Sequence, residues 1–303
     1  MTWIIIAAIG YFFLATTFIL DKYILSRTAV AKPSVYAFYS TIIMWGALIL
    51  IPFSSEYWNV VDIGIGLLSG VAFGFGLYTL YLAVKGGEAS HVNPISGATV
   101  ILVTYVLSHV FLYEQLPAVQ LCGIGLLILA SLFLSYEATA RTRGFHIGYL
   151  WAIVSGMFFA ASHVSSKYLY GIHDFLPALG WTRAGTGILG IVLLFVPAVR
   201  RDLHMRFFEK TKNVPKNHSL FLVWTAKVAG IVAVVLIQYA AALGSVTVVQ
   251  AMSGLQYALM FVAIYVLSRW FPRMFREYFS RRELVLQITG IILVIMGSIF
   301  IVI

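Results

Sequence analysis

Apolar stretches of about 20 residues recur along the whole chain and are separated by short polar segments. An α-helix rises about 1.5 Å per residue, so a stretch of this length crosses the hydrocarbon core of a bilayer. The alternation over about ten residues that is typical of outer-membrane β-barrels is absent, and residues 124–134 are apolar on every face. The pattern therefore predicts an all-α integral membrane protein.

Ten transmembrane helices are predicted from this pattern. Prolines lie at or beside most of their boundaries, where a missing N–H is tolerated best. The longest polar segment, Arg200–Ser219, is too short for a separate domain and is predicted to be a basic connector. The predicted spans are residues 3–21, 34–53, 62–84, 91–112, 117–136, 146–168, 176–197, 220–243, 246–268 and 284–303.

The composition agrees with a location in a membrane. Of the 303 residues, 61% are hydrophobic and 10% are charged, whereas about a quarter of a soluble chain is charged. The net charge of +9 comes from loops beside the spans, not from a patch interleaved with aromatic residues, so nucleic acid is not an expected partner. The single cysteine, Cys122, excludes an intrachain disulfide. The first span lacks a basic leader, so we expect no cleaved signal peptide.

Basic residues are concentrated in alternate loops. The loops after the first, third, fifth, seventh and ninth spans hold 17 of the 20 Lys and Arg residues, and the intervening loops hold none. Cytoplasmic loops are enriched in Lys and Arg, so these five loops are predicted to be cytoplasmic and both chain ends external. The residues are Lys22, Arg27, Lys32, Lys85, Arg141, Arg143, Arg200, Arg201, Arg206, Lys210, Lys212, Lys216, Arg269, Arg273, Arg276, Arg281 and Arg282.

The two halves of the chain resemble each other. Residues 87–97 align without gaps with residues 244–254, which superimposes two Ser-Gly pairs and places Asn93 opposite Gln250. The first spans of the two halves also share a Phe-Phe pair that is followed by a Lys-Tyr pair. The chain is therefore predicted to be a duplicated five-helix unit.

The predicted halves are residues 1–140 and 141–303. Because five crossings are an odd number, the second copy enters the membrane from the opposite side, and the copies are inverted repeats. The loop charges agree, since the loop between spans two and three has no Lys or Arg while its counterpart between spans seven and eight has six.

The junction of the fourth and fifth spans carries a short motif. Residues 112–117 read Leu-Tyr-Glu-Gln-Leu-Pro and are followed by Gln120 and Gly123. Together with the ten spans and the two halves, this motif resembles the drug/metabolite transporter superfamily, in particular its ten-helix EamA-type members. In that family a glycine usually stands where this chain has Tyr113.

The resemblance implies a fold and a way of working. It implies a transporter that works by alternating access, with a central cavity lined mainly by the first, third and fourth helices of each half, and it implies no cofactor. Arg183 is similar in place to an arginine often found in the second helix of a half, and Ser40 stands near that place in the first half. Many members are expected to have both termini in the cytoplasm, whereas the loop charges here predict the reverse.

Three basic side chains inside the spans are the first candidates for solute binding. A charge in the hydrocarbon region costs about 2.5–3.5 kcal/mol, so it persists where it faces a cavity, finds a partner or reaches the interface. Lys227 could bind a solute or extend to the basic-loop side. Arg183 could clamp a carboxylate or phosphate, or it could bond to backbone carbonyls. His163 could relay protons, or it could be a neutral, hydrogen-bonded histidine.

Uncharged polar and aromatic side chains complete the candidate site. Asn93, Gln250 and Gln256 lie near the starts of the fourth and ninth spans, where they could orient a polar solute or bond across helices. Tyrosines in the third and eighth spans are chosen mostly on the resemblance, as aromatic walls, although such residues more often serve packing. These tyrosines are Tyr78, Tyr81 and Tyr239.

The predicted function is secondary transport of a small metabolite. The solute is predicted to be anionic or carboxylate-bearing, because no acidic residue deep in the spans matches the three basic groups. The alternative is a lipid-head-group flippase subunit or a scaffold that moves no solute. An enzyme is not expected, because no zinc-protease, nucleophile-elbow, Cys-x-x-Cys or phosphate-loop motif occurs. Membrane lipid is the other expected partner, the coupling ion is open, and the expected location is the plasma (inner) membrane.

The predicted orientation can be tested with single cysteines introduced in two loops. An impermeant thiol reagent added outside intact cells should label Ser55→Cys, because loop 2–3 is predicted to be external, and should not label Asn213→Cys. Labelling of Asn213→Cys without Ser55→Cys would reverse the orientation.

Overall fold

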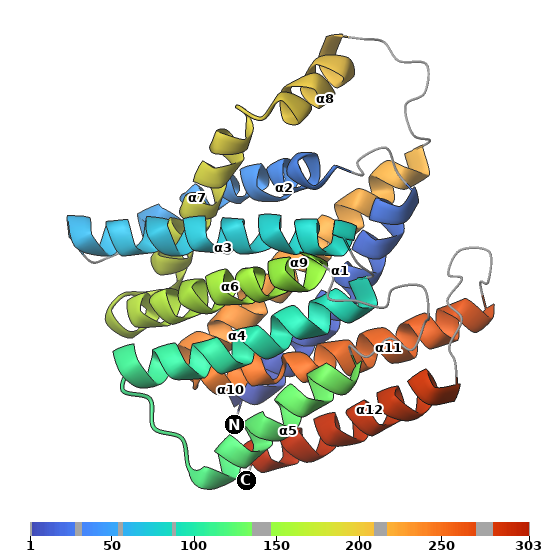
Figure 1. The fold of residues 1–303 in the computed structure, drawn as a ribbon. Helices are drawn as coiled ribbons and strands as arrows, with labels where there is room; N and C mark the ends of the chain where they lie inside the picture. The colour runs from blue at the N-terminus through green and yellow to red at the C-terminus, as the bar shows by residue number, and fades with distance from the viewer. Residues whose placement is uncertain are drawn as a thin grey trace.

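The computed structural model describes residues 2–27, 32–53, 57–86, 89–134, 147–208, 217–270 and 281–302. These residues form helices and no strand (Figure 1), which confirms the predicted all-α class. The helices are α1 (Thr2–Arg27), α2 (Pro33–Ile42), the 3-10 helix η1 (Ile43–Phe53), α3 (Val60–Gly86), α4 (Ala89–Phe111), α5 (Ala118–Leu134), α6 (Ile147–Ile172), α7 (Phe175–Leu193), α8 (Pro197–Phe208), α9 (Asn217–Leu243), α10 (Val246–Ala251), α11 (Ser253–Trp270) and α12 (Arg281–Val302).

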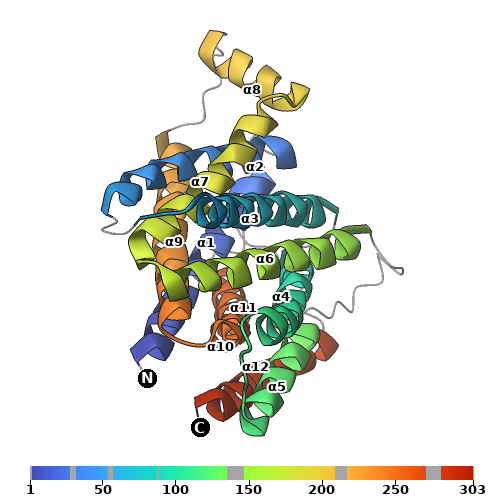
Figure 2. The ribbon, with the colours of Figure 1, turned by 90° about the vertical axis from the view of Figure 1, so that its left-hand side faces the viewer.

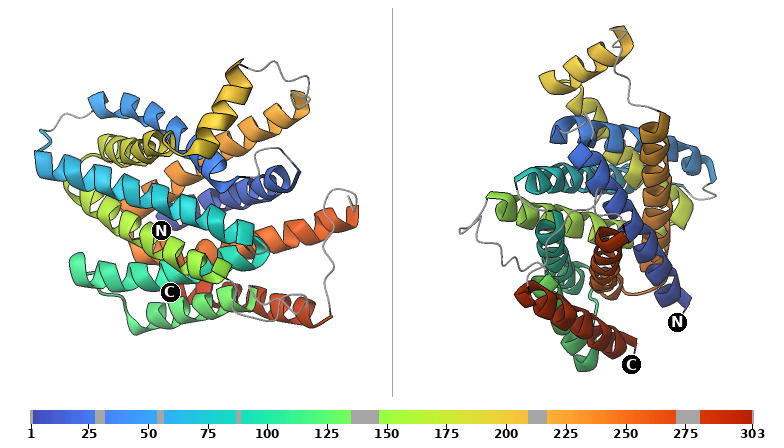
Figure 3. Two further views of the ribbon diagram at one scale, coloured as in Figure 1. Left: turned by 45° about the horizontal axis from the view of Figure 1, so that its top comes forward. Right: turned by 90° about the vertical axis from the view of Figure 1, so that its right-hand side faces the viewer.

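In the described part of the chain, nine helical segments are long and apolar enough to cross a bilayer. The remaining predicted span is α5, whose 17 residues stand at the lower limit of the usual range of about 17–25. A tenth crossing therefore stays a prediction. The two chain ends lie near each other in every view (Figure 3), as an even number of crossings would place them.

Helix ends that flank the predicted cytoplasmic loops gather on one side of the molecule. The C-terminal ends of α1 and α11 lie beside the N-terminal ends of α9 and α12, on the right in Figure 1. The described helix ends that flank these loops therefore lie on one face, as the charge pattern requires. Whether that face is cytoplasmic still rests on the Lys and Arg distribution.

Three segments differ from the predicted spans. The second span is α2 continued by η1, and the ninth span is divided into α10 and α11. The predicted connector begins instead with a helix, α8, which starts at Pro197 because proline is favoured at the first helical position. The Tyr39 hydroxyl donates to the Asp202 carboxylate (3.0 Å) and ties α8 to α2. Figures 1 and 2 show α8 at the edge of the molecule, far from α5 and α12.

The fourth helix of each half is irregular at the same aligned position. In the register that sets residues 87–97 against 244–254, Pro94 falls opposite Ala251. Pro94 lies inside α4, where it has no N–H for the helical hydrogen bond. Ala251 is the last residue of α10, and α11 begins two residues later. Pro94 and the break between α10 and α11 therefore lie next to the aligned pair Asn93 and Gln250.

Small residues let α3 and α7 approach closely. A Cβ atom added to Gly70 would overlap the carbonyl oxygen of Thr182, and one added to Gly185 would overlap the carbonyl oxygen of Leu67. Backbones can approach this closely only where side chains are absent. The approach fixes the position of the α7 residues beside Thr182 relative to the middle of α3.

Contacts between the predicted halves come in related pairs. The helix α3 packs on α6, and its counterpart α9 packs on α1. The last helices of the two halves, α5 and α12, pack on each other and lie together at one end of the molecule (Figure 2). The second helices also meet, because α2 and η1 both contact α7.

A strained turn ends α4 at the family-like motif. The Glu114 amide N–H donates to the Ser108 carbonyl (3.2 Å), six positions back along the chain, and so closes the end of the helix. Helices commonly end at a left-handed residue, and Tyr113, just before Glu114, has φ 53°. Glycine takes this conformation without a steric penalty. The geometry explains why glycine is usual at this position in the family that the motif resembles.

Replacing Tyr113 with glycine should stabilise the protein. The left-handed conformation costs an ordinary residue about 1–2 kcal/mol, and the greater chain entropy of glycine offsets about 0.5–1 kcal/mol of that gain. Tyr113→Gly should therefore raise the midpoint of thermal unfolding in detergent. The matched control is Tyr57→Gly, since Tyr57 is similarly exposed and lacks a positive φ. An equal or lower midpoint for Tyr113→Gly than for the control would contradict the argument.

Candidate functional site

A cavity of about 200 Å³ lies in the middle of the helix bundle. Its walls come from α1, α2, α3, α4, α6, α9, α10 and α11, and most of the lining side chains are apolar. These walls include the first, third and fourth helices of each half, which the resemblance implies, and also α2. The volume is somewhat larger than the cavity of about 150 Å³ that holds one benzene molecule in an engineered protein core. The cavity therefore suits a small solute.

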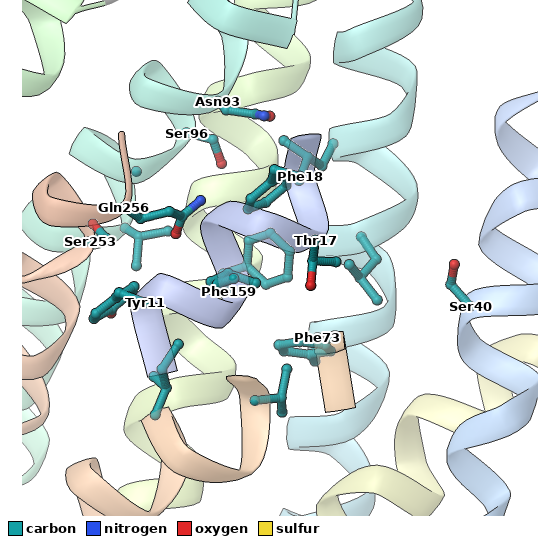
Figure 4. A pocket seen from close by; sticks show the side chains of 18 of the residues that line it. Tyr11, Thr17, Phe18, Ser40, Phe73, Asn93, Ser96, Phe159, Ser253 and Gln256 are labelled. Carbon is teal, nitrogen blue, oxygen red and sulfur yellow. The ribbon is translucent and has the colours of Figure 1, made fainter. Parts of the chain in front are cut away.

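Uncharged polar groups gather on one side of the cavity. In Figure 4, Asn93 and Ser96 from α4 and Ser253 and Gln256 from α11 lie on the same side of the cavity, and the Ser96 hydroxyl donates to the Ser155 hydroxyl on α6 (3.4 Å). The Asn93 Oδ1 atom, the Ser253 Oγ atom and the Gln256 Nε2 atom are buried and make no hydrogen bond with the described residues. The Nε2 atom of Gln250, which also lines the cavity, is in the same situation.

The unpartnered amides need an explanation, because buried polar groups are nearly always hydrogen-bonded. Asn93 and Gln250 are each 4% exposed, so bulk water does not reach them freely. Asn93 precedes Pro94 inside α4, and Gln250 stands beside the break between α10 and α11. Interrupted helices commonly form the solute sites of membrane transporters. The cluster can hydrogen-bond a polar group that enters the cavity.

A cationic group stands on the other side. The Lys227 ammonium donates to the hydroxyls of Tyr36 and Ser40, both at 3.0 Å, and lies 4.2 Å from the centre of the Tyr36 ring. Tyr81 donates to the same Ser40 oxygen (3.2 Å). In Figure 4, Ser40 lies apart from the amide cluster, with Thr17, Phe18, Phe73 and Phe159 between them. The cavity therefore has a cationic side, an apolar middle and an uncharged polar side.

His163 is held by a neighbouring amide. The Gln238 Nε2 atom donates to His163 Nδ1 (3.2 Å), so the imidazole acts as an acceptor on that nitrogen. The ring of His163 lies against Phe73 and Phe159. This is the neutral, hydrogen-bonded arrangement, although His163 and Gln238 both line the cavity. A role in proton relay stays a prediction.

The structure brings six of the nine predicted site residues to the cavity. Three lie outside it. Tyr239 is 40% exposed and packs on the Phe175 ring at 5.1 Å, and Tyr78 packs in the apolar cluster between α2 and α7. Arg183 is buried behind the cavity wall, with its guanidinium carbon 4.3 Å from the centre of the Phe73 ring. The six are Lys227, His163, Asn93, Gln250, Gln256 and Tyr81.

Sequence reasoning missed several cavity residues. Ser96 and Ser253 belong to the aligned Ser-Gly pairs, so the repeat carried a signal for them. Tyr11 lines the cavity and donates to the Val249 carbonyl (2.8 Å). No pattern marks Tyr11 or Phe73 among 17 tyrosines and 22 phenylalanines.

Another basic residue, Lys167, ties α6 to the end of α9. The Lys167 ammonium on α6 donates to the carbonyls of Ala241 (2.8 Å), Ala242 (3.0 Å) and Gly244 (2.7 Å). These carbonyls belong to the C-terminal end of α9, where a cation is favoured by the helix dipole. Nearby, Thr247 donates to the Glu114 carboxylate (2.6 Å). The end formed by α4, α6, α9 and α10 is thus tied by polar contacts.

Comparison with known families supports the predicted resemblance. Residues 1–136 match the EamA-like transporter family. The match lies within the first predicted half and covers 136 of the 303 residues. The resemblance is therefore confirmed, and the apolar helices of the described residues make the protein a multi-pass membrane protein.

A solved structure extends the likeness in fold to the whole chain. One chain, described only as "Crystal structure of protein", is 15% identical, with a TM-score of 0.63, and the match covers 98% of each chain. At this identity the likeness concerns the fold alone. No curated protein sequence matches. Among the described residues, no group of three or more His, Cys, Asp or Glu side chains could hold a metal ion.

Removing the Lys167 ammonium should destabilise the protein. Hydrogen bonds that involve a charged group contribute about 1.5–3 kcal/mol, so Lys167→Met should lower the free energy of unfolding by at least about 1.5 kcal/mol. The control is Lys85→Met, since Lys85 is exposed at the end of α3. The midpoint of thermal unfolding in detergent measures the difference. Equal midpoints for the two variants would show that the tie contributes nothing.

Proposed function

We propose that the protein is a secondary transporter that carries a small anionic metabolite through the central cavity. The proposal rests on the cavity in the middle of this membrane protein. Residues that line it carry buried polar atoms that have no hydrogen-bond partner among the described residues. A purely structural core would leave such atoms at a cost of about 1–3 kcal/mol each. A solute that enters and leaves the cavity would satisfy them for part of a transport cycle.

The anionic character of the solute is proposed from Lys227. Its ammonium lines the cavity, whose described lining residues include no Asp or Glu. A carboxylate or phosphate at this point would form charge-assisted hydrogen bonds, which are about twice as strong as neutral ones. The Tyr36 and Ser40 hydroxyls hold the ammonium in place. The amide cluster would receive an uncharged polar part of the same solute.

Alternating access is proposed from the arrangement of the helices. The halves 1–140 and 141–303 are proposed as inverted repeats, a view supported by the related contacts of α3 with α6 and of α9 with α1. The α6 and α9 helices line the cavity and are joined at one end by Lys167. Breaking that tie would let the two helices separate at this end. The plasma (inner) membrane remains the proposed location.

The predicted site residues have different places in this proposal. Tyr81 reaches the cationic side through Ser40, and the amides Asn93, Gln250 and Gln256 orient the solute. Tyr78 and Tyr239 lie outside the present cavity. A contact of either ring with the solute would require another conformation of α3 or α9.

Neutralising Lys227 should weaken transport. Uptake into proteoliposomes is measured for a panel of amino acids, nucleosides and organic acids, and the transported member is then tested with Lys227→Gln. We expect uptake at low solute concentration to fall more than ten-fold, or about 1.4 kcal/mol. Lys85→Gln, at an exposed helix end, should retain the original rate.

Two results would contradict the proposed function. Transport of an organic cation, or unchanged uptake by Lys227→Gln, would show that the solute is not bound as an anion by Lys227. Scrambling of a fluorescent lipid without uptake of any solute in the panel would favour a flippase instead.

A further inference from the structure

Arg183 is a buried charge whose partner is not evident. Its side chain is 3% exposed, and its Nε, Nη1 and Nη2 atoms make no hydrogen bond with the described residues. The guanidinium carbon lies 4.3 Å from the centre of the Phe73 ring, and the Tyr170 side chain is also nearby. A buried, unpaired charge costs more than one cation–π contact returns, so the ring alone does not account for the position of Arg183.

Phe73 separates Arg183 from the cavity. The Phe73 ring lines the cavity (Figure 4) and is itself 7% exposed. Its other contacts are also rings, since the Phe159 ring packs edge-on against it at 5.1 Å. The close approach of α7 to Gly70 puts Arg183 beside α3, and Phe73 lies nearly one turn further along the same helix. A turn of the Phe73 side chain would therefore open a path between the cavity and the guanidinium.

The repeat relates Arg183 to Lys227. In the register that aligns residues 87–97 with 244–254, Gly70 stands opposite Lys227 and Phe73 stands opposite Gly230. Lys227 on α9 bonds to Ser40 on α2, and Arg183 on α7 lies where α7 passes Gly70 on α3. Each of the two related contacts thus holds one cation, on the third helix in one contact and on the second helix in the other, and both cations belong to the second half.

The two related positions differ in what covers them. Beside Lys227, the aligned residue Gly230 has no side chain, and Lys227 is open to the cavity. Beside Arg183, Phe73 fills the space instead. The difference lies in the sequence, because position 230 has no side chain that could cover Lys227, whereas the Phe73 ring can change its rotamer and uncover Arg183.

We infer that Arg183 is a second anion-binding site for the carboxylate or phosphate group of the transported solute, covered by Phe73 in this conformation. The inference rests on the proposed function, because the anion reaches Arg183 from the transport cavity. The planar guanidinium can bind such a group through two parallel hydrogen bonds. The Tyr170 hydroxyl is buried and makes no hydrogen bond with the described residues, so it can donate a further bond.

The test uses an arginine-selective reagent on the purified full chain in lipid nanodiscs. Phenylglyoxal modification of Arg183 is followed by mass spectrometry of the peptide that contains it, for the original protein and for Phe73→Ala. Phe73→Ala should be modified at Arg183 at least ten times faster, because the cover is removed. Sodium phosphate or sodium acetate, at constant ionic strength, should slow the modification with saturation, and sodium chloride should not.

Two further variants control for disruption of the fold. Phe158→Ala removes a ring that stacks on Phe75 and does not line the cavity, and it should leave the rate unchanged. Phe73→Leu opens a smaller gap and should give an intermediate rate if Phe73→Ala unfolds. Elution as a single species and the midpoint of thermal unfolding check each variant.

Three outcomes would overturn the inference. The same slow rate in both Phe73 variants would show that Phe73 does not cover Arg183. Fast modification that no anion slows would make Arg183 a structural residue. Protection by chloride alone would assign the site to an inorganic ion rather than to a solute group. The assay contains no transport step and is repeated with Lys227→Gln, so its result is independent of the test of the proposed function.

Discussion

A positive charge inside the hydrocarbon region must find partners or face a cavity, and this constraint organises the structure around three residues. Lys167 caps three backbone carbonyls at the end of α9. Lys227 faces the central cavity and is held by hydroxyls of α2. Arg183 is buried against an aromatic ring. The first arrangement stabilises the end of α9, the second leaves a cation at the cavity, and the third keeps a cation behind Phe73.

The polar side of the cavity follows from the backbone of the fourth helices. Pro94 and the break after Ala251 remove regular helical hydrogen bonds at aligned positions. Both positions stand beside Asn93 and Gln250, two residues that line the cavity and carry unpartnered amide atoms. Each half therefore contributes an amide to the polar wall, whereas Lys227 and Arg183 both come from the second half, on α9 and α7. The proposed solute has an anionic end and a neutral polar end.

The sequence was most informative where a physical constraint is local. Span length and loop charge located the helices to within a few residues, and the motif at Tyr113 located a turn. The 3-10 segment Ile43–Phe53 and the break at Met252 were not predictable, because apolar composition does not distinguish a continuous helix from an interrupted one. For the same reason Tyr78 and Tyr239 were expected at the cavity. Which face of an apolar helix points inward depends on packing between helices. Tyr78 and Tyr239 are uncharged, so their residue type does not indicate which way they face.

The central claim is that this cavity recognises an anion through Lys227. A thermal-unfolding screen of purified protein against metabolites of positive, negative and zero charge tests it most directly, because a ligand that binds the folded state raises the midpoint. The account predicts that the stabilising compounds carry a carboxylate or phosphate and that Lys227→Gln abolishes their effect. Stabilisation by organic cations, or by anions equally in Lys227→Gln, would contradict it.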